Sequence, residues 1–178
     1  LEIPTAPLHE ARVAAFIVKK ARSWGYTVRR SPKGNLLVGS RVAFRRPHCI
    51  ITAHMDHPGI RLLSVKGRRG MVGILGGVPQ DLLRGSRWRL WDEAGSTTGV
   101  IGRATPKKWM GNFTTTIQLR KTMARGAFGQ LHLPPPTWRG DSVSSRAMDN
   151  VINVATQVFL LPIILFLVII LRQRHVKQ

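Results

Sequence analysis

The middle of the chain, from about residue 60 to 136, most constrains the fold. Its apolar pieces are only a few residues long, and turns rich in Gly, Ser and Asp separate them. The pieces read "RLLSV", "GMVGILGG", "SRWRLW", "TTGVIGRA" and "FTTTIQL". Short strands at regular spacing are typical of a small all-β unit, whereas helices need longer periodic segments. We therefore predict a barrel-like β domain over residues 60–136.

The sequence on either side of this unit has a different pattern. Residues 8–24 carry apolar positions at helical spacing, with Pro7 near the start and Gly25 just past the end, which predicts a helix. "YTVRR" and "LLVGS" on either side of "SPKGN" predict a hairpin, and "HCIITAHMD" predicts a buried strand. We predict an α/β layer structure over residues 1–59 that resumes over 137–157, after the stiff linker "LPPPTW".

The C-terminal part contains an uninterrupted apolar run, "VFLLPIILFLVIIL", followed by the basic tail "RQRHVKQ". We predict an apolar helix with a basic tail over residues 158–178. Extended back to residue 151, the segment 151–171 has about the 20 residues that a membrane-spanning helix needs. The basic tail would then suit the cytoplasmic side. A buried core helix is the competing interpretation, and the sequence leaves both open.

The net charge of +20 arises from 28 Lys and Arg residues against eight acids. Such a charge is typical of proteins that bind nucleic acid or an anionic membrane surface. The basic residues nevertheless come in short groups along the whole chain. The sequence has no basic zipper helix, zinc finger or aromatic RNA-binding signature. We therefore favour a solvated basic surface over nucleic-acid binding as the explanation.

The cysteine content and the first residues of the chain give indications of the cellular compartment. Cys49 is the single cysteine, so an internal disulfide is excluded and a reducing compartment fits. The opening "LEIPTAPLHE" has no apolar segment of the kind found in secretory signals. The chain also begins without Met, as a fragment would.

The stretch "ITAHMDHPG", residues 51–59, contains the strongest candidate site. An apolar strand ends there in a His-x-Asp pattern, and because strand side chains alternate, His54 and Asp56 point to the same side. An imidazole supported by a carboxylate suits a metal ligand. A lone histidine at this position would more often be a core residue than a metal ligand. The carboxylate of Asp56 favours the ligand interpretation of His54. His57 points the other way, and we interpret it as a loop residue.

Several motifs occur in a familiar order: "IPTAPLHEARV", "KGNLLV", "ITAHMDHPG", "GILGGVPQDLLRGSRWRL", "TTGVIG" and "GAFGQLHLPPPTWRGDSVSSRAMDN". Over about residues 1–155 the chain resembles the glutamyl-aminopeptidase family of co-catalytic zinc peptidases, which includes the tetrahedral and deblocking aminopeptidases. The pair "AHMD" and "RAMDN", with a β-rich insert between them, is more specific than either motif alone.

The resemblance implies a three-layer α/β peptidase domain, here truncated, with an inserted barrel-like domain. It implies two divalent metal ions, zinc or cobalt, with His54 as a metal ligand, Asp56 as the catalytic carboxylate that orients it, and Asp149 bridging both metals. It also implies short peptide substrates, a homo-oligomer and a cytoplasmic location.

The sequence departs from the family's pattern after Asp149. The family's site also needs a Glu base beside a Glu ligand, a further acid and a second histidine downstream. Here no Asp or Glu follows, and the only later histidine is His175. A truncated or frame-shifted gene, or a partial sequence, would produce this pattern. Two functions remain: an aminopeptidase of weak activity, or a non-catalytic basic protein that keeps the scaffold and is anchored to a membrane through 151–171.

Overall fold

The computed structural model describes residues 3–45, 50–145, 151–160 and 166–170. They divide into two compact units. The first consists mainly of residues 10–56 and 134–173, and the second of residues 4–9 and 57–133. We describe each unit separately.

The first unit begins with helix α1, Ala11–Ser23, which confirms the helix predicted from the apolar spacing. The helix ends where Gly25 adopts a φ of +80°, a conformation that glycine tolerates without steric cost. The N–H of Tyr26 then donates to the carbonyl of Ala21 at 3.0 Å, which closes the last turn. The predicted end of the helix at Gly25 is therefore correct.

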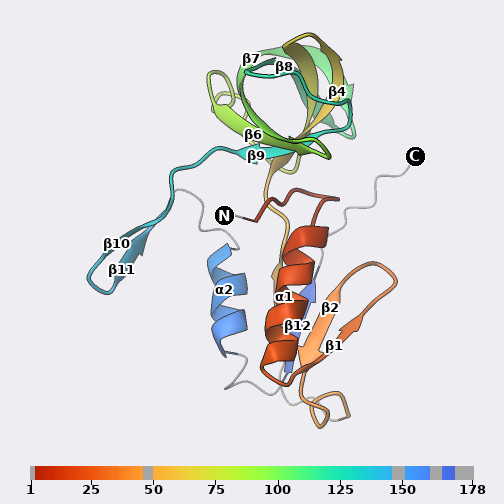
Figure 1. The fold of residues 1–178 in the computed structure, drawn as a ribbon, viewed down its shortest axis with the longest axis vertical. Helices are drawn as coiled ribbons and strands as arrows, with labels where there is room; N and C mark the ends of the chain where they lie inside the picture. The colour runs from red at the N-terminus through yellow and green to blue at the C-terminus, as the bar shows by residue number, and fades with distance from the viewer. Residues whose placement is uncertain (1–2, 46–49, 146–150, 161–165, 171–178) are drawn as a thin grey trace. The chain divides into compact units, whose positions relative to one another are not determined.

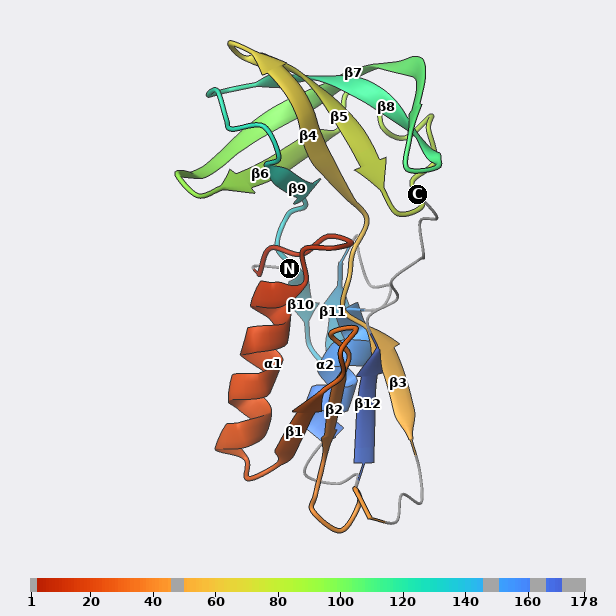
Figure 2. The same cartoon turned by 90° about the vertical axis from the view of Figure 1, so that its right-hand side faces the viewer.

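A four-stranded sheet also belongs to this unit (Figure 2). Its strands, in chain order, are β1 Thr27–Arg30, β2 Leu36–Gly39, β3 Ile51–His54 and β12 Phe166–Ile170. Their order across the sheet is β1-β2-β12-β3. β1 and β2 pair as the antiparallel hairpin that the sequence predicts, while β12 runs antiparallel to β2 and parallel to β3.

One apolar cluster joins the helices of this unit to the sheet. Its fully buried members are Ala14, Ile17 and Ala21 of α1 together with Leu36, Val38 and Met55. Val154 of the second helix, α2 Val151–Leu160, packs against the same cluster. Both helices therefore contribute to one core in the described part of the chain. The three-layer arrangement stays a prediction.

The C-terminal apolar run differs from its prediction. The apolar helix predicted for the run that begins at residue 158 is wrong, because α2 ends at Leu160 and residues 166–170 form strand β12. An apolar run without periodicity does not distinguish a buried helix from a buried strand. The β-branched residues Val168, Ile169 and Ile170 favour the strand, and a position between β2 and β3 provides hydrogen-bonding partners on both edges.

The membrane-spanning interpretation of residues 151–171 also finds no support. None of the helices in the described residues is long and apolar enough to cross a membrane. Residues 161–165 and the tail 171–178 lie outside the described residues.

The second unit is a closed antiparallel β-barrel (Figure 1), which confirms the predicted barrel-like unit. Its strands follow one another around the barrel in the order β4-β5-β8-β7-β6-β9. Their bounds are β4 Gly59–Lys66, β5 Arg69–Leu75, β6 Arg87–Asp92, β7 Gly95–Trp109, β8 Asn112–Leu119 and β9 Phe128–Leu131. Pairing of β4 with β9 closes the ring.

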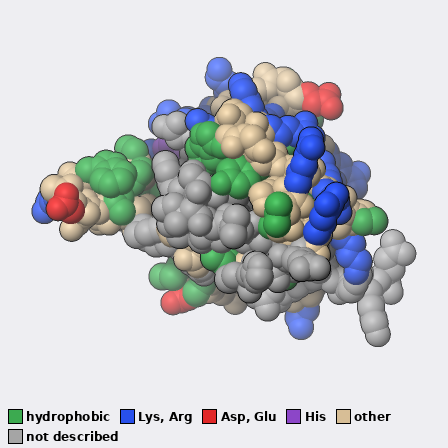
Figure 3. Space-filling view, turned by 90° about the horizontal axis from the view of Figure 1, so that it is seen from below, with side chains coloured by type: hydrophobic (Ala, Val, Ile, Leu, Met, Phe, Trp, Pro, Cys, Tyr) green, Lys and Arg blue, Asp and Glu red, His purple; other side chains and the backbone are tan. Residues whose placement is uncertain are grey.

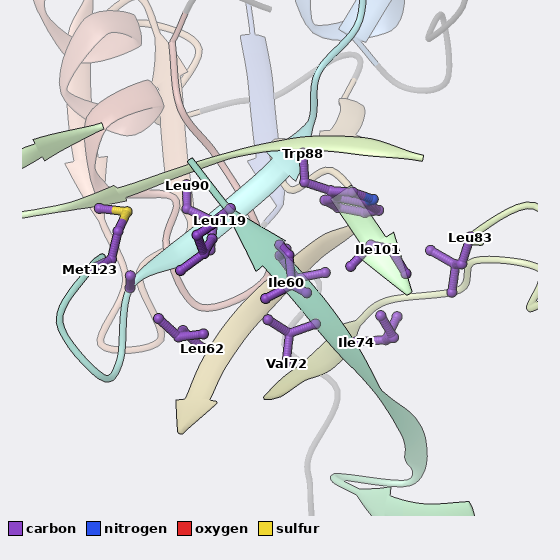
Figure 4. Packing of buried hydrophobic residues seen from close by; sticks show 12 residues of the cluster. Ile60, Leu62, Val72, Ile74, Leu83, Trp88, Leu90, Ile101, Leu119 and Met123 are labelled. Atoms are coloured by element: carbon purple, nitrogen blue, oxygen red, sulfur yellow. The ribbon is translucent and has the colours of Figure 1, made fainter. Parts of the chain in front are cut away.

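Inward-facing side chains fill the barrel (Figure 4). In β6, Trp88 and Leu90 are buried while Arg87 and Arg89 are exposed, which is the alternation expected of a strand with one face on the core. The buried set is Ile60, Leu62, Val72, Ile74, Leu83, Trp88, Leu90, Ile101, Ile117, Leu119, Met123 and Ala127.

Residues 4–9, which we call the strap, pack on the barrel. The N–H of Thr5 donates to the side-chain oxygen of Gln130 at 3.1 Å, and Ala6 is completely buried. The ring of His9 stacks on Phe128 with a centroid separation of 4.3 Å. The strap is thus fixed to β9 by a hydrogen bond and a ring contact that no sequence pattern indicated.

A small hairpin precedes the residues that the structure leaves undescribed near Asp149. It pairs β10, Thr137–Arg139, with β11, Ser142–Ser144, and Gly140 occupies its turn at a φ of +56° (Figure 1). The hairpin is exposed, and Trp138 at its centre is 72% exposed.

Candidate metal centre

Strand β3 positions the first candidate ligand. His54 is the last residue of β3, and in the parallel pairing with β12 it lies opposite Ile170. The carboxyl ends of these two strands therefore lie at the same edge of the sheet. In α/β sheets that edge is where ligands usually bind.

The imidazole of His54 is held by the residue two positions further on. Its Nδ1 atom lies 3.0 Å from the carbonyl oxygen of Asp56 and 3.1 Å from the carboxylate atom Oδ1 of the same residue. A carbonyl can only accept, so this contact assigns the proton to Nδ1. The other ring nitrogen, Nε2, is then an unprotonated lone-pair donor, which is the form that binds metals.

The carboxylate of Asp56 is largely enclosed. The side chain of His54 is 28% exposed and that of Asp56 is 17% exposed. Oδ1 of Asp56 is buried, and the described residues offer it no hydrogen-bond donor, because its short approach to Nδ1 lacks hydrogen-bond geometry. A buried carboxylate oxygen without a donor is costly, and a nearby cation would relieve that cost.

This pair fits one ligand of a divalent metal ion together with its supporting acid. The neutral imidazole of His54 is a ligand type that zinc accepts at about 2.0–2.1 Å, and the carboxylate of Asp56 lies on the Nδ1 side of the ring, where a supporting group is expected. A catalytic zinc site generally has three protein ligands. Among the described residues, however, no group of three His, Cys, Asp or Glu side chains comes together. The pair is therefore at most part of a centre.

Of the other two residues considered for this site, the structure describes one and not the other. Asp149 lies outside the described residues, so its convergence with His54 stays a prediction. His57 lies in the segment between β3 and β4, as the loop interpretation predicts. The backbone carbonyl of Asp56 is the functional group that sequence reasoning missed, because every residue carries a carbonyl and only the fold decides where it points.

Solved structures with a similar fold include three that bear on function. The Pyrococcus horikoshii TET1 peptidase gives a TM-score of 0.72 at 18% identity, over 94% of this chain and 56% of that one. An aminopeptidase from Desulfurococcus kamchatkensis gives 0.67 at 17% identity, over 98% and 53% of the two chains. An endoglucanase from Thermotoga maritima gives 0.73 at 16% identity, over 96% and 57%.

The likeness establishes the fold. The chain spans about half the length of these solved structures. Their names include an endoglucanase beside a peptidase and an aminopeptidase, so the shared fold does not by itself decide the reaction. The TET1 peptidase can assemble into a tetrahedron or a large octahedral shell. No protein-family model and no curated protein matches the chain in sequence.

Proposed function

We propose that this chain carries part of the metal centre of a metal-dependent aminopeptidase. The observation that supports the proposal best is the contact between His54 and Asp56 at the carboxyl end of β3. It orients a histidine as a metal ligand in a fold shared with a peptidase and an aminopeptidase of known structure. By the resemblance of its motifs, we extend the proposal to short peptide substrates and a homo-oligomer.

The residues have separate roles in this proposal. His54 binds one cation through Nε2, and Asp56 holds the imidazole in that orientation and supplies negative charge beside it. Asp149 would supply a carboxylate to this cation and to a second one. When bound, zinc or cobalt would polarise the peptide carbonyl and lower the pKa of a coordinated water.

The proposal also predicts weak catalysis by the chain alone. A carboxylate base that takes a proton from the attacking water contributes about 10²–10⁴-fold to such reactions. In the described residues no further acid approaches His54 and Asp56 closely enough to form a three-residue cluster, and the sequence has no acid after Asp149. The glutamyl and deblocking subgroups are not distinguished by these observations.

Cobalt binding tests the proposal without relying on turnover. Titration of the purified chain with Co²⁺, followed by the visible absorption of the bound ion, should show a site that disappears in His54→Ala. The matched control is His132→Ala, because His132 is an exposed histidine in the barrel unit. Its removal should leave the cobalt spectrum unchanged.

Two outcomes would contradict the proposal. Cobalt absorption that persists in His54→Ala would place the ligand elsewhere. Equal losses in His54→Ala and His132→Ala would indicate non-specific binding to surface histidines.

A further inference from the structure

The barrel gathers basic residues that the sequence disperses. In an antiparallel pair, residues directly opposite each other project to the same side of the sheet, with Cβ atoms about 4.5–5.5 Å apart. Lys66 of β4 lies opposite Arg69 of β5, and Arg69 lies opposite Gln118 of β8. The row of outward-facing residues thus begins with two cations on adjacent strands.

The same row continues across the next two strands. Gln118 lies opposite Val100 of β7, and Val100 lies opposite Arg87 of β6. One unbroken row of side chains, three of them basic, therefore crosses five strands of the barrel wall.

A neighbouring row adds two further cations. Arg89, two residues along β6 from Arg87, lies opposite Thr98. The N–H of Arg120 donates to the carbonyl of Thr98 at 2.9 Å, so Arg120 lies beside the same position. We call the exposed set formed by the two rows the cationic band: Lys66, Arg69, Arg87, Arg89 and Arg120.

A shallow hollow of about 500 Å³ lies in the barrel wall beside this band. Lys66 and Arg69 line it together with the polar side chains of Ser64, Thr116 and Gln118. A glycine keeps it open: a Cβ on Gly102 would come within 2.4 Å of the Thr116 hydroxyl.

Among the described residues of the barrel unit, no acid forms an ion pair with the band. The barrel segment 57–133 contains three acidic residues, Asp81, Asp92 and Glu93. The carboxylate of Asp92 already accepts from the N–H groups of Ala94 and Ala124, both at 3.0 Å. Within the described residues, the barrel has no ion pair between a Lys or Arg and a carboxylate. On the face drawn in Figure 3, which does not identify the band, Lys and Arg side chains are widespread and Asp and Glu side chains few.

The sequence alone, in which the basic residues are dispersed, favours a solvated basic surface; because the barrel brings them together, we now propose that the cationic band binds the phosphate backbone of a nucleic acid. Like charges directly opposite each other on a sheet are destabilising, and Lys66 and Arg69 form such a pair. A phosphate between them would reduce that cost. Guanidinium groups match phosphate oxygens in a planar two-bond geometry. Hydroxyl and amide groups such as those of Thr116 and Gln118 are common additional donors to phosphate.

A nucleic acid fits these features better than an acidic peptide does. Four of the five cations are arginines, and they form rows along which a regularly charged backbone can run. The absence of exposed aromatic rings from the lining of the hollow indicates contact with phosphates and not stacking with bases.

Fluorescence anisotropy with the full chain tests this inference. The probes are a labelled single-stranded oligonucleotide, its duplex and a labelled polyglutamate of similar length. Between about 50 and 200 mM salt, the logarithm of the association constant for the single strand should fall with a slope near −3.5, since each of five neutralised phosphates contributes about −0.7. Tighter binding of the single strand or of the duplex supports the inference and identifies the form preferred.

Charge-reversal variants test whether the cationic band is the surface that binds the nucleic acid. The double variant Arg69→Glu, Arg87→Glu should weaken binding at least about tenfold and reduce the salt slope, because two phosphate contacts are lost. The control is Lys107→Glu, Lys108→Glu, which makes the same change of charge near the far end of β7, roughly 25 Å along the strand from Val100. This control should retain most of the binding.

Three results would overturn the inference. One is equal loss of binding in the two double variants, and another is polyglutamate binding as tight as that of the nucleic acids. The third is a salt slope near zero for the unmodified chain. This measurement needs no variant, so it tests the inference even if the band variant fails to fold.

Discussion

The Nδ1 atom of His54 lies 3.0 Å from the backbone carbonyl of Asp56, slightly closer than the 3.1 Å that separates it from the carboxylate of the same residue. The carbonyl cannot be removed by a side-chain substitution. The orientation of the histidine should therefore depend only in part on the acidic side chain of Asp56.

The first prediction follows from this geometry. Asp56→Asn should lower cobalt or zinc affinity by about tenfold, the lower end of the usual 10–100-fold effect of removing a supporting group. The carbonyl still holds Nδ1 in this variant, while the negative charge beside the metal is lost. Isothermal titration against the unmodified chain measures the change, and abolition of binding would show that the carboxylate is itself a ligand.

The second prediction concerns catalysis. The purified chain should hydrolyse leucyl or glutamyl anilides very slowly, even with zinc or cobalt added, because the carboxylate base and several ligands are missing from its sequence after Asp149. Turnover that requires metal and disappears in Asp149→Asn would contradict this. It would mean that another subunit supplies the missing groups.

The third prediction tests the contact between the strap and the barrel. A Cβ on Gly59 would lie 2.5 Å from the Cβ of Ala6 and 2.9 Å from the carbonyl oxygen of Gly129. Gly59→Ala should therefore lower the free energy of unfolding by roughly 1–3 kcal/mol, as overpacking usually does. Urea denaturation measures it. Gly77→Ala is the control, because nothing lies within 4 Å of a Cβ there. Similar stability of both variants would show that the strap does not pack at Gly59.

The fourth prediction concerns pH. Burial, and to a smaller extent the nearby charge of Arg61, lowers the pKa of His9 below its ordinary value of 6.5. Its Nε2 atom is buried and has no hydrogen-bond partner in the part of the chain that the structure describes. Below pH 6.5 the unfolded chain therefore binds more protons at this residue than the folded chain does. The stability that neutral His9 contributes is fully present above pH 6.5 and decreases as the pH falls below it.

Thermal unfolding between pH 5 and 8 measures this dependence. His9→Phe keeps a ring to stack on Phe128 and removes the titrating group, so its melting temperature should fall less at low pH than that of the unmodified chain. His132→Gln, at an exposed histidine, should leave the dependence unchanged. An unaltered pH profile in His9→Phe would refute the role of His9.

Local patterns predicted several elements well. The helical spacing of residues 8–24 and the glycine at position 25 correspond to α1 and its end, because capping and periodicity act over a few residues. The turn-punctuated stretch 60–136 corresponds to a closed barrel, because frequent glycine turns leave room only for short strands. The run 158–171 was misread, because a uniformly apolar run has no period to measure.

The sequence predicted the part of the candidate site whose residues are close together in the chain. His54 and Asp56 are two residues apart, so a short stretch of chain is enough to bring them together, although β3 itself ends at His54. Whether Asp149 joins them depends on contacts between segments about 95 residues apart, which local periodicity does not specify.

The sequence by itself determined that a short-strand barrel forms, that a helix ends at Gly25, and that a histidine and an acid meet at the end of β3. These features depend on interactions between residues close in the chain. Only the tertiary structure decided that Phe166–Ile170 is a strand, that the strap packs on β9, and that dispersed basic residues form one band. Each of these results from pairing between distant strands, where the register, and not the local pattern, determines which side chains become neighbours.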